Sequence, residues 1–209
     1  MESMETTVSS EEALVRLKEG NKRFLQGGHS LTAFDLEKMR GELVSEQHPF
    51  AVVIACSDSR VPPSLIFDQD LGDLFVIRVA GNVVGPSQVA SVEYAVDVLK
   101  SSLVVVVGHT GCGAIGAAVK AMLDPDLHYS PAMDMLVGRI SEAVYNDDAF
   151  DAAGSMGEKC EIAGGANVVH ALENLVNFSD IIRSAVEEER VKLVGSEYDM
   201  RTGIVNWMD

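Results

Sequence analysis

Short runs of apolar residues recur along the middle of the chain, separated by stretches in which apolar residues return at helical spacing. Three of these runs, residues 50–55, 74–79 and 103–107, have the composition and length of buried strands. The third is an uninterrupted run of Leu and Val, which suits a strand buried on both faces. A short helix at 62–67 and a longer one at about 88–99 lie between them. This alternation predicts a mostly parallel sheet with helices on both faces.

The second half of the chain has a weaker pattern at first. Residues 124–165 contain Pro and Gly and a mixed helical segment near 133–145, and they predict little. Two helices and then two strands are predicted beyond them, at about 167–178, 179–189, 191–198 and 203–207. The spacing of the last two strands favours a hairpin, so the last strand would be antiparallel. The predicted fold class is α/β, a three-layer α/β/α arrangement with a central sheet of about five strands.

Two helices are predicted before the first strand, and they form an N-terminal arm over about residues 9–45. Ser9 and Glu12 have capping-box spacing, and the helix that they begin ends at Gly27 and Gly28. The apolar residues on one face of each helix are Leu14, Leu17, Phe24 and Leu25 in the first, and Leu36, Met39 and Leu43 in the second, around 34–44. Such an arm must bury its apolar stripe on its own sheet or on a partner subunit. Because no strand precedes it, we expect a partner subunit to cover it.

Composition narrows the class of protein. The 209 residues suit one domain over 1–209, and a hydrophobic content of 47% is normal for a globular chain. The net charge of −16 disfavours nucleic acid and anionic membrane surfaces as partners. Three cysteines do not make a disulfide framework and favour a metal site or a reducing compartment. The acidic N-terminus resembles neither a secretory signal nor a transit peptide, and no run reaches the roughly 18 apolar residues of a membrane span, so we expect a cytoplasmic protein.

Two clusters of polar residues follow the first and third predicted strands. They read Cys56-x-Asp58-x-Arg60 and His109-x-x-Cys112. Open α/β sheets bind their ligands at the carboxyl ends of neighbouring strands, so we expect Cys56, His109 and Cys112 to converge. Thiolate and imidazole are ligands that zinc prefers, and three of them with one exchangeable position form a catalytic site. Each residue alone would suit an ordinary buried thiol or a hydrogen-bonded core histidine, but the whole set favours a zinc site.

Asp58 and Arg60 have two alternative interpretations beside this site. Arg60 can hold Asp58 ionised through a bidentate pair, while Asp58 contacts a water on the zinc and acts in catalysis. Asp58 can instead become the fourth zinc ligand and close the site. Taken without the metal ligands, the two residues would form only a surface ion pair of small energetic value.

The two clusters together resemble the motifs of the β-class carbonic anhydrases. Residues 67–82, 91–95 and 108–113 also resemble that family closely, and residues 198–203 are similar to its closing hairpin. The resemblance covers roughly residues 14–207. It implies reversible hydration of CO2 to bicarbonate and a proton by zinc-bound hydroxide, with one zinc per chain. It also implies a homodimer as the smallest active unit, often assembled further into tetramers, with the arm wrapped over the partner.

The resemblance assigns roles to residues outside the two clusters. Gln47 matches a glutamine that donates a hydrogen bond to a substrate oxygen across the dimer interface. Phe75 and Ala80 fall where the family places apolar residues that line the CO2 pocket. Gly113, at the end of the His109 motif, belongs to the same substrate-binding group.

One departure from the family pattern concerns a second, regulatory bicarbonate site found in a subset of the family. That site is built partly on a tryptophan three residues before the first cysteine, where this chain has Val53. Arg78 and Tyr198 match other parts of the site. We therefore expect the regulatory pocket to be missing and the resting zinc to carry water.

Two rival functions remain open at the level of sequence. The same zinc ligands would serve hydrolysis of COS or CS2, because attack on a linear heterocumulene is the same chemistry. A non-catalytic protein would instead keep Asp58 as a permanent fourth ligand in a closed structural zinc site. Arg60 argues against that second rival, since it would lose its carboxylate partner.

Overall fold

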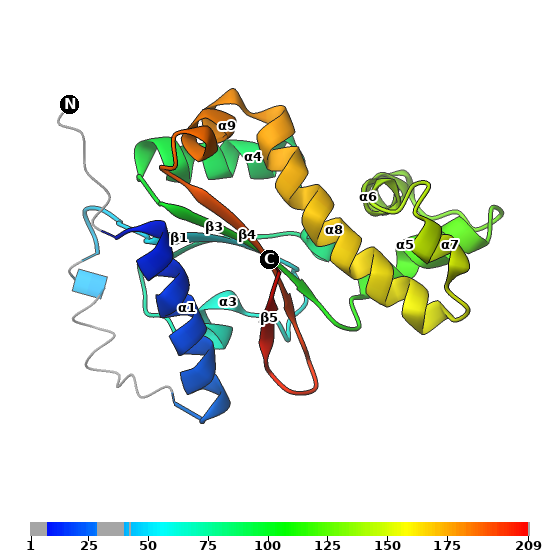
Figure 1. The fold of residues 1–209 in the computed structure, drawn as a ribbon, viewed down its shortest axis with the longest axis horizontal. Helices are drawn as coiled ribbons and strands as arrows, with labels where there is room; N and C mark the ends of the chain where they lie inside the picture. The colour runs from blue at the N-terminus through cyan, green and yellow to red at the C-terminus, as the bar shows by residue number, and fades with distance from the viewer. Residues whose placement is uncertain (1–7, 29–39, 42, 209) are drawn as a thin grey trace.

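Five strands form one sheet in the order β2-β1-β3-β4-β5 in a computed structural model of the protein, which describes residues 8–28, 40–41 and 43–208 (Figure 1). The strands are β1 (Ala51–Ala55), β2 (Leu74–Arg78), β3 (Leu103–His109), β4 (Lys192–Tyr198) and β5 (Val205–Trp207). The first four are parallel to one another, and β5 pairs with β4 in antiparallel fashion. The predicted fold class, including the antiparallel last strand, is confirmed.

The burial of each strand follows its place in the sheet. All residues of β1 and β3 are buried, because these strands lie inside the sheet and are covered on both faces. Strand β2 lies at one edge, and its residues are only partly buried or exposed. The continuous apolar runs in β1 and β3 are therefore typical of central strands.

The helices cover both faces of the sheet. They are α1 (Ser10–Leu25), α3 (Pro63–Ile66), α4 (Pro86–Glu93), α5 (Gly113–Leu123), α6 (Pro131–Glu142), α7 (Asp148–Ala152), α8 (Met156–Phe178) and α9 (Asp180–Glu187). A short 3-10 turn, η1 (Ala80–Asn82), follows β2, and a π-helical turn, η2 (Tyr94–Val98), extends α4. None of the helices in the described part of the chain combines the length and the apolar composition needed to span a bilayer.

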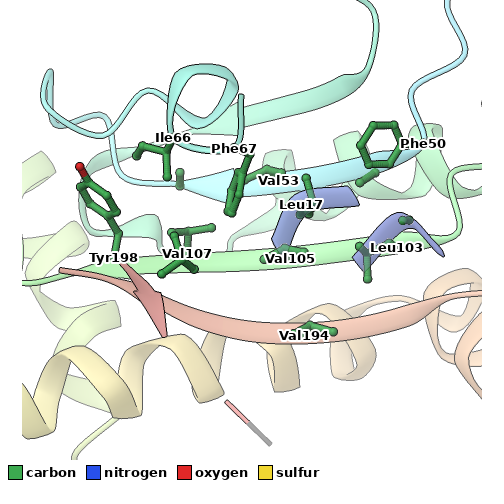
Figure 2. Close-up of a cluster of buried hydrophobic side chains, with 14 of the residues drawn as sticks. Leu17, Phe50, Val53, Ile66, Phe67, Leu103, Val105, Val107, Val194 and Tyr198 are labelled. Carbon is green, nitrogen blue, oxygen red and sulfur yellow. The ribbon is translucent and has the colours of Figure 1, made fainter. Parts of the chain in front are cut away.

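Alternate side chains of the central strands build two separate cores. Val53 of β1 points to the face covered by α1 and α3, where it packs in one cluster with Leu17 and Ile66 (Figures 1 and 2). Val52 and Ile54 point to the opposite face, which α4, α8 and α9 cover. This alternation is the expected consequence of the two-residue period of a strand.

The expectation that a partner subunit covers the first helix is wrong for the centre of its apolar face. Leu17 is fully buried within its own chain, in the cluster that holds Phe50, Val105 and Val194 (Figure 2). Because α4, α8 and α9 lie on the other face of the sheet, the segment before β1 is available to cover this one. The second predicted helix, around 34–44, falls mainly on residues outside those described, Leu36 and Met39 among them.

The stretch between residues 124 and 165 is helical and lies beside the carboxyl ends of the strands. Helices α5, α6 and α7 pack with the first half of α8 in a third apolar cluster that also contains Cys56 and Cys112 (Figure 1). Helix α8 begins at Met156 rather than near residue 167, with Ser155 as its N-cap and a capping box to Glu158. Helices α5, α6 and α7 and the first half of α8 therefore form one wall of the region where the polar clusters lie.

Candidate metal centre

The two polar clusters meet where the order of the strands reverses. Cys56 directly follows β1, and His109 is the last residue of β3, which pairs with β1. Cys112 comes three residues later, as the N-cap of α5. The chain leaves β1 toward β2 on one side and later returns to β3 on the other, and ligand sites of open α/β sheets lie at such a point.

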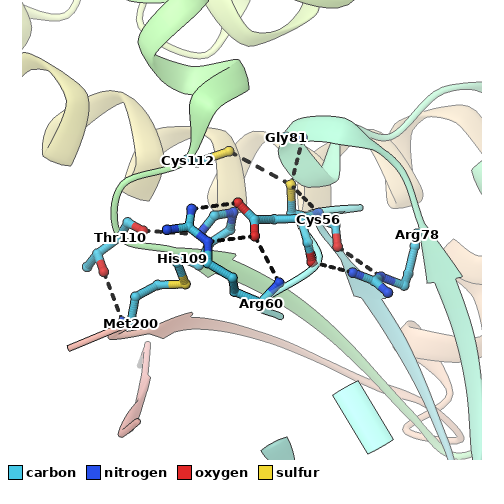
Figure 3. Close-up of polar contacts among 9 residues, drawn as sticks. Cys56, Arg60, Arg78, Gly81, His109, Thr110, Cys112 and Met200 are labelled. Atoms are coloured by element: carbon cyan, nitrogen blue, oxygen red, sulfur yellow. Dashed lines mark hydrogen bonds and ion pairs between the residues drawn. The ribbon is translucent and has the colours of Figure 1, made fainter. Parts of the chain in front are cut away.

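The side chains of Cys56, His109 and Cys112 converge and are all buried. Their ligand atoms lie within 4.8 Å of one another, and the two Sγ atoms are 3.9 Å apart (Figure 3). His109 Nδ1 lies 3.1 Å from the carbonyl oxygen of Thr110, so Nδ1 is the protonated nitrogen of the neutral ring. Nε2 is buried and has no hydrogen-bond partner among the described residues. Two sulfurs and one available imidazole lone pair fit a zinc ion.

The surroundings of Cys56 favour its thiolate form. A hydrogen bond from the Cys112 thiol lowers the pKa of Cys56 well below that of a free thiol, and burial opposes this shift. The backbone N–H groups of Asp58 and Gly81 also donate to Cys56 Sγ, at 3.4 and 3.3 Å. The pKa of Cys112 is raised, first by the same hydrogen bond and then by burial. A metal ion bound between the two sulfurs would take both as thiolates and displace the proton that they share in this hydrogen bond.

Asp58 and Arg60 form a bidentate ion pair at the rim of this centre. Arg60 Nε and Nη2 donate to the two carboxylate oxygens of Asp58 at 2.9 and 2.8 Å, and the Arg60 backbone N–H donates at 3.0 Å (Figure 3). These contacts lower the pKa of Asp58 and keep it ionised. The group of converging ligand atoms does not include the Asp58 carboxylate.

Arg78 holds the loop that carries Cys56 and Asp58. Its Nε donates to the carbonyl oxygen of Cys56 at 3.0 Å, and its Nη2 donates to the carbonyl oxygen of Asp58 (Figure 3). On the other side, the Tyr198 carbonyl accepts from the N–H of Thr110, and Thr110 Oγ1 accepts from the N–H of Met200. The turns after β1 and β3 are therefore each fixed by a neighbouring strand end.

Comparisons with known proteins agree with this geometry. The sequence model of the family described as carbonic anhydrase matches residues 51–205. A carbonic anhydrase of Pseudomonas aeruginosa is 38% identical over 173 residues, which cover 80% of this chain and 76% of that one. The solved structure of the beta-carbonic anhydrase CcaA has a TM-score of 0.76 and 29% identity, and covers 94% of this chain and 87% of that chain. The chain belongs to the β-class carbonic anhydrase family.

Two further members of the family match over different shares of the chain. Carbonic anhydrase 2 of Mycobacterium tuberculosis is 44% identical over 128 residues, so the match spans 61% of this chain and 61% of that relative. A structure described as one of two tetrameric beta-carbonic anhydrases from Sordaria macrospora has a TM-score of 0.74 at 28% identity, covering 84% of this chain and 88% of that one.

The four residues that the carbonic anhydrase resemblance assigns to substrate lie in different places. Ala80 and Gly113 are next to the centre, Ala80 beside Gly81 and Gly113 directly after Cys112. Phe75 lies within β2, where it packs partly buried against the second core and has its ring centroid 6.2 Å from that of Tyr94.

Gln47 lies at the opposite end of β1 from the centre. It is exposed, and it precedes the strand that Cys56 follows. The intervening residues 50–56 span about 20 Å as an extended chain, because a strand rises about 3.3 Å per residue. The Gln47 side chain therefore does not reach Cys56 of the same chain.

Proposed function

We propose that this protein catalyses the reversible hydration of CO2 to bicarbonate and a proton, with one zinc ion per chain held by Cys56, His109 and Cys112. The observation that carries the proposal is the convergence of two sulfurs and an unpaired His109 Nε2, all buried, at the carboxyl ends of β1 and β3. Membership of the carbonic anhydrase family supports the same reaction. A cytoplasmic location is part of the proposal.

Each residue of the centre has a part in this reaction. When bound, a zinc ion lowers the pKa of a water and so supplies the nucleophile that attacks CO2. The thiolates of Cys56 and Cys112 would hold the ion by charge, and the hydrogen bond from His109 Nδ1 to the Thr110 carbonyl keeps the ring in the tautomer that offers Nε2. Asp58 accepts a hydrogen bond from the water and orients it, while Arg60 keeps Asp58 ionised and in place.

Two features support an open catalytic site over a closed structural one. Both carboxylate oxygens of Asp58 already accept hydrogen bonds from Arg60. The Asp58 carboxylate also lies outside the group of converging ligand atoms. A fourth protein ligand from Asp58 would require this bidentate pair to break, and we propose that form only as a closed, inactive state.

We propose further that a second copy of the chain completes each site as a homodimer. Gln47 lies about one strand length from its own Cys56, so it can approach substrate only in a partner's site. Around Gln47 is a hollow of about 750 Å³, whose lining includes Leu71, Tyr94 and Val98. These three apolar side chains are about half exposed beside the edge strand β2, which suits burial against another copy. Phe75 and Ala80, on and after the same edge strand, would then line the CO2 pocket near Gly113.

Zinc analysis combined with stopped-flow hydration of CO2 tests the proposal. Cys112→Ala should lose both zinc and activity, because it removes one of the three protein ligands. Cys160→Ala is the matched control, since Cys160 is a half-buried cysteine outside the group of converging ligand atoms. A Cys112→Ala protein that keeps full zinc and the full rate would overturn the metal site. Parallel assays with COS and CS2 separate CO2 hydration from the rival hydrolase.

A further inference from the structure

A buried amide of α8 contacts the turn that follows β2. Asn167 is only 2% exposed, and its Nδ2 donates a hydrogen bond to the carbonyl oxygen of Gly81 at 2.8 Å. The N–H of Gly81 in turn donates to Cys56 Sγ at 3.3 Å (Figure 3). Two consecutive hydrogen bonds therefore connect the middle of α8 with the sulfur of a proposed zinc ligand.

Gly81 depends on its neighbours for a defined orientation. Its φ of +67° lies in the left-handed region, which favours glycine. A Cβ atom at this position would lie 2.8 Å from Ile140 Cδ1 and 3.1 Å from Ala114 Cβ, so no larger residue fits without a shift. Glycine is also the residue with the greatest backbone freedom. The bond from Asn167 is therefore well placed to fix the direction of the Gly81 N–H.

The direction of that N–H affects how well the Cys56 thiolate is stabilised. A backbone donor near a thiolate stabilises the negative sulfur, and this stabilisation depends on distance and alignment. Loss of a group that hydrogen-bonds to a metal ligand typically lowers metal affinity or activity by about 10- to 100-fold, because such groups orient the ligand. Cys56 Sγ has a second backbone donor, the N–H of Asp58, which Asn167 does not contact.

We propose that Asn167 is a positioning residue of the metal centre, which acts through the Gly81 backbone to hold a hydrogen-bond donor on the Cys56 sulfur. It contacts neither substrate nor the sulfur itself. The proposal rests on the proposed function, in that it takes Cys56 to be a zinc ligand.

Zinc affinity of an isosteric variant tests this role. Asn167→Leu keeps the number and branching of the side-chain heavy atoms and removes the donor, and zinc affinity, measured by competition with a chromophoric chelator, should fall by about 10- to 100-fold. Asn174→Leu is the matched control, because Asn174 is a buried asparagine two turns along the same helix, away from the Gly81 turn. Its affinity should stay within about threefold of the parent value. Asn167→Gln retains an amide donor and should recover part of the loss.

Hydrogen exchange of the two backbone amides that donate to Cys56, those of Gly81 and Asp58, is a second test. In the zinc-loaded, 15N-labelled protein, Asn167→Leu should speed hydrogen exchange of the Gly81 amide by about tenfold and leave that of Asp58 unchanged. Asn167→Ala serves as the second variant should the Leu protein not fold, since Ala is the best helix former. Unchanged affinity and unchanged Gly81 exchange, or an equal loss in Asn174→Leu, would overturn the proposal. Failure of the parent protein to bind zinc would overturn the proposed function instead.

Discussion

The bidentate pair between Arg60 and Asp58 gives the sharpest test of how the centre works. Arg60→Ala removes two of the three hydrogen bonds that Asp58 accepts from this residue and leaves only the backbone N–H. The Arg60 side chain is 61% exposed, and an ion pair of that kind contributes little to folding stability. We therefore expect Tm to stay within about 3 °C of the parent value.

Activity should respond far more than stability. Asp58 without its guanidinium partner is less fixed and freer to take the fourth ligand position, so CO2 hydration should fall by about 10- to 100-fold. Zinc content should remain at the parent level, because the three protein ligands are intact. Arg60→Lys keeps the charge without the planar fork and should lose less activity.

Stopped-flow hydration assays with parallel zinc analysis and thermal melts check this expectation. Arg16→Ala is the control, since Arg16 also forms an exposed ion pair, with Glu12 on α1, far along the chain from the centre. Full activity in Arg60→Ala would refute the positioning role of the pair. A matching loss of Tm and of rate would show that Arg60 supports the fold and not the chemistry.

Three other measurements test separate parts of the structure. Leu17→Ala should lower the free energy of unfolding in urea by about 3 kcal/mol, while Val15→Ala, on the exposed side of α1, should change it little; equal effects would contradict the packing of α1. Burial, followed by repulsion from nearby acidic groups, raises the pKa of Glu197, so the contribution of this residue to stability falls as pH rises above about 4.3. Glu197→Gln should then gain stability relative to the parent at pH 7 but not at pH 4, and an equal gain at both would show that its charge is not the cause. Because fully buried Val53 stands where a subset of the family has a tryptophan, bicarbonate should inhibit without cooperativity, and a sigmoidal loss of rate would show a regulatory pocket.

Most of the sheet could be predicted because its strands are marked by local patterns. The runs that became β1 and β3 are continuous and apolar, as central parallel strands require. The start of α8 was missed, although Ser155 and Glu158 have capping-box spacing, because Gly164 and Gly165 interrupt the helical pattern. In the structure the helix packs closely on β3 at Gly164 and Val168, where a Cβ at Gly108 would lie 3.9 Å from the Gly164 carbonyl oxygen and 2.7 Å from Val168 Cγ2.

The burial of α1 could not be predicted, because it depends on which face of the sheet the later helices leave open. No pattern within residues 10–25 records that α4, α8 and α9 all pack on the other face. For the same reason the sequence favoured a partner subunit for Leu17.

The metal centre also has a part that could be predicted from the sequence and a part that could not. Cys56, His109 and Cys112 carry recognisable side-chain chemistry at fixed spacing, so their convergence could be predicted from neighbouring strand ends. The contacts around them use backbone groups, such as the Gly81 N–H on sulfur and the Thr110 carbonyl on the imidazole. Backbone donors and acceptors belong to every residue type, and their positions emerge only from the folded chain.

The position of Gln47 at the far end of β1 has a genetic consequence in the proposed dimer. Each site would draw its cysteines from one chain and its glutamine from the other, so lesions at Gln47 and at Cys112 would damage different sites. A chain with Gln47→Ala paired with a chain with Cys112→Ala has one doubly damaged site and one intact site. Two inactive proteins mixed in equal amounts, with free exchange of subunits, would thus restore about one quarter of the sites. Complementation between alleles, normally a sign of two genes, would arise here within a single one.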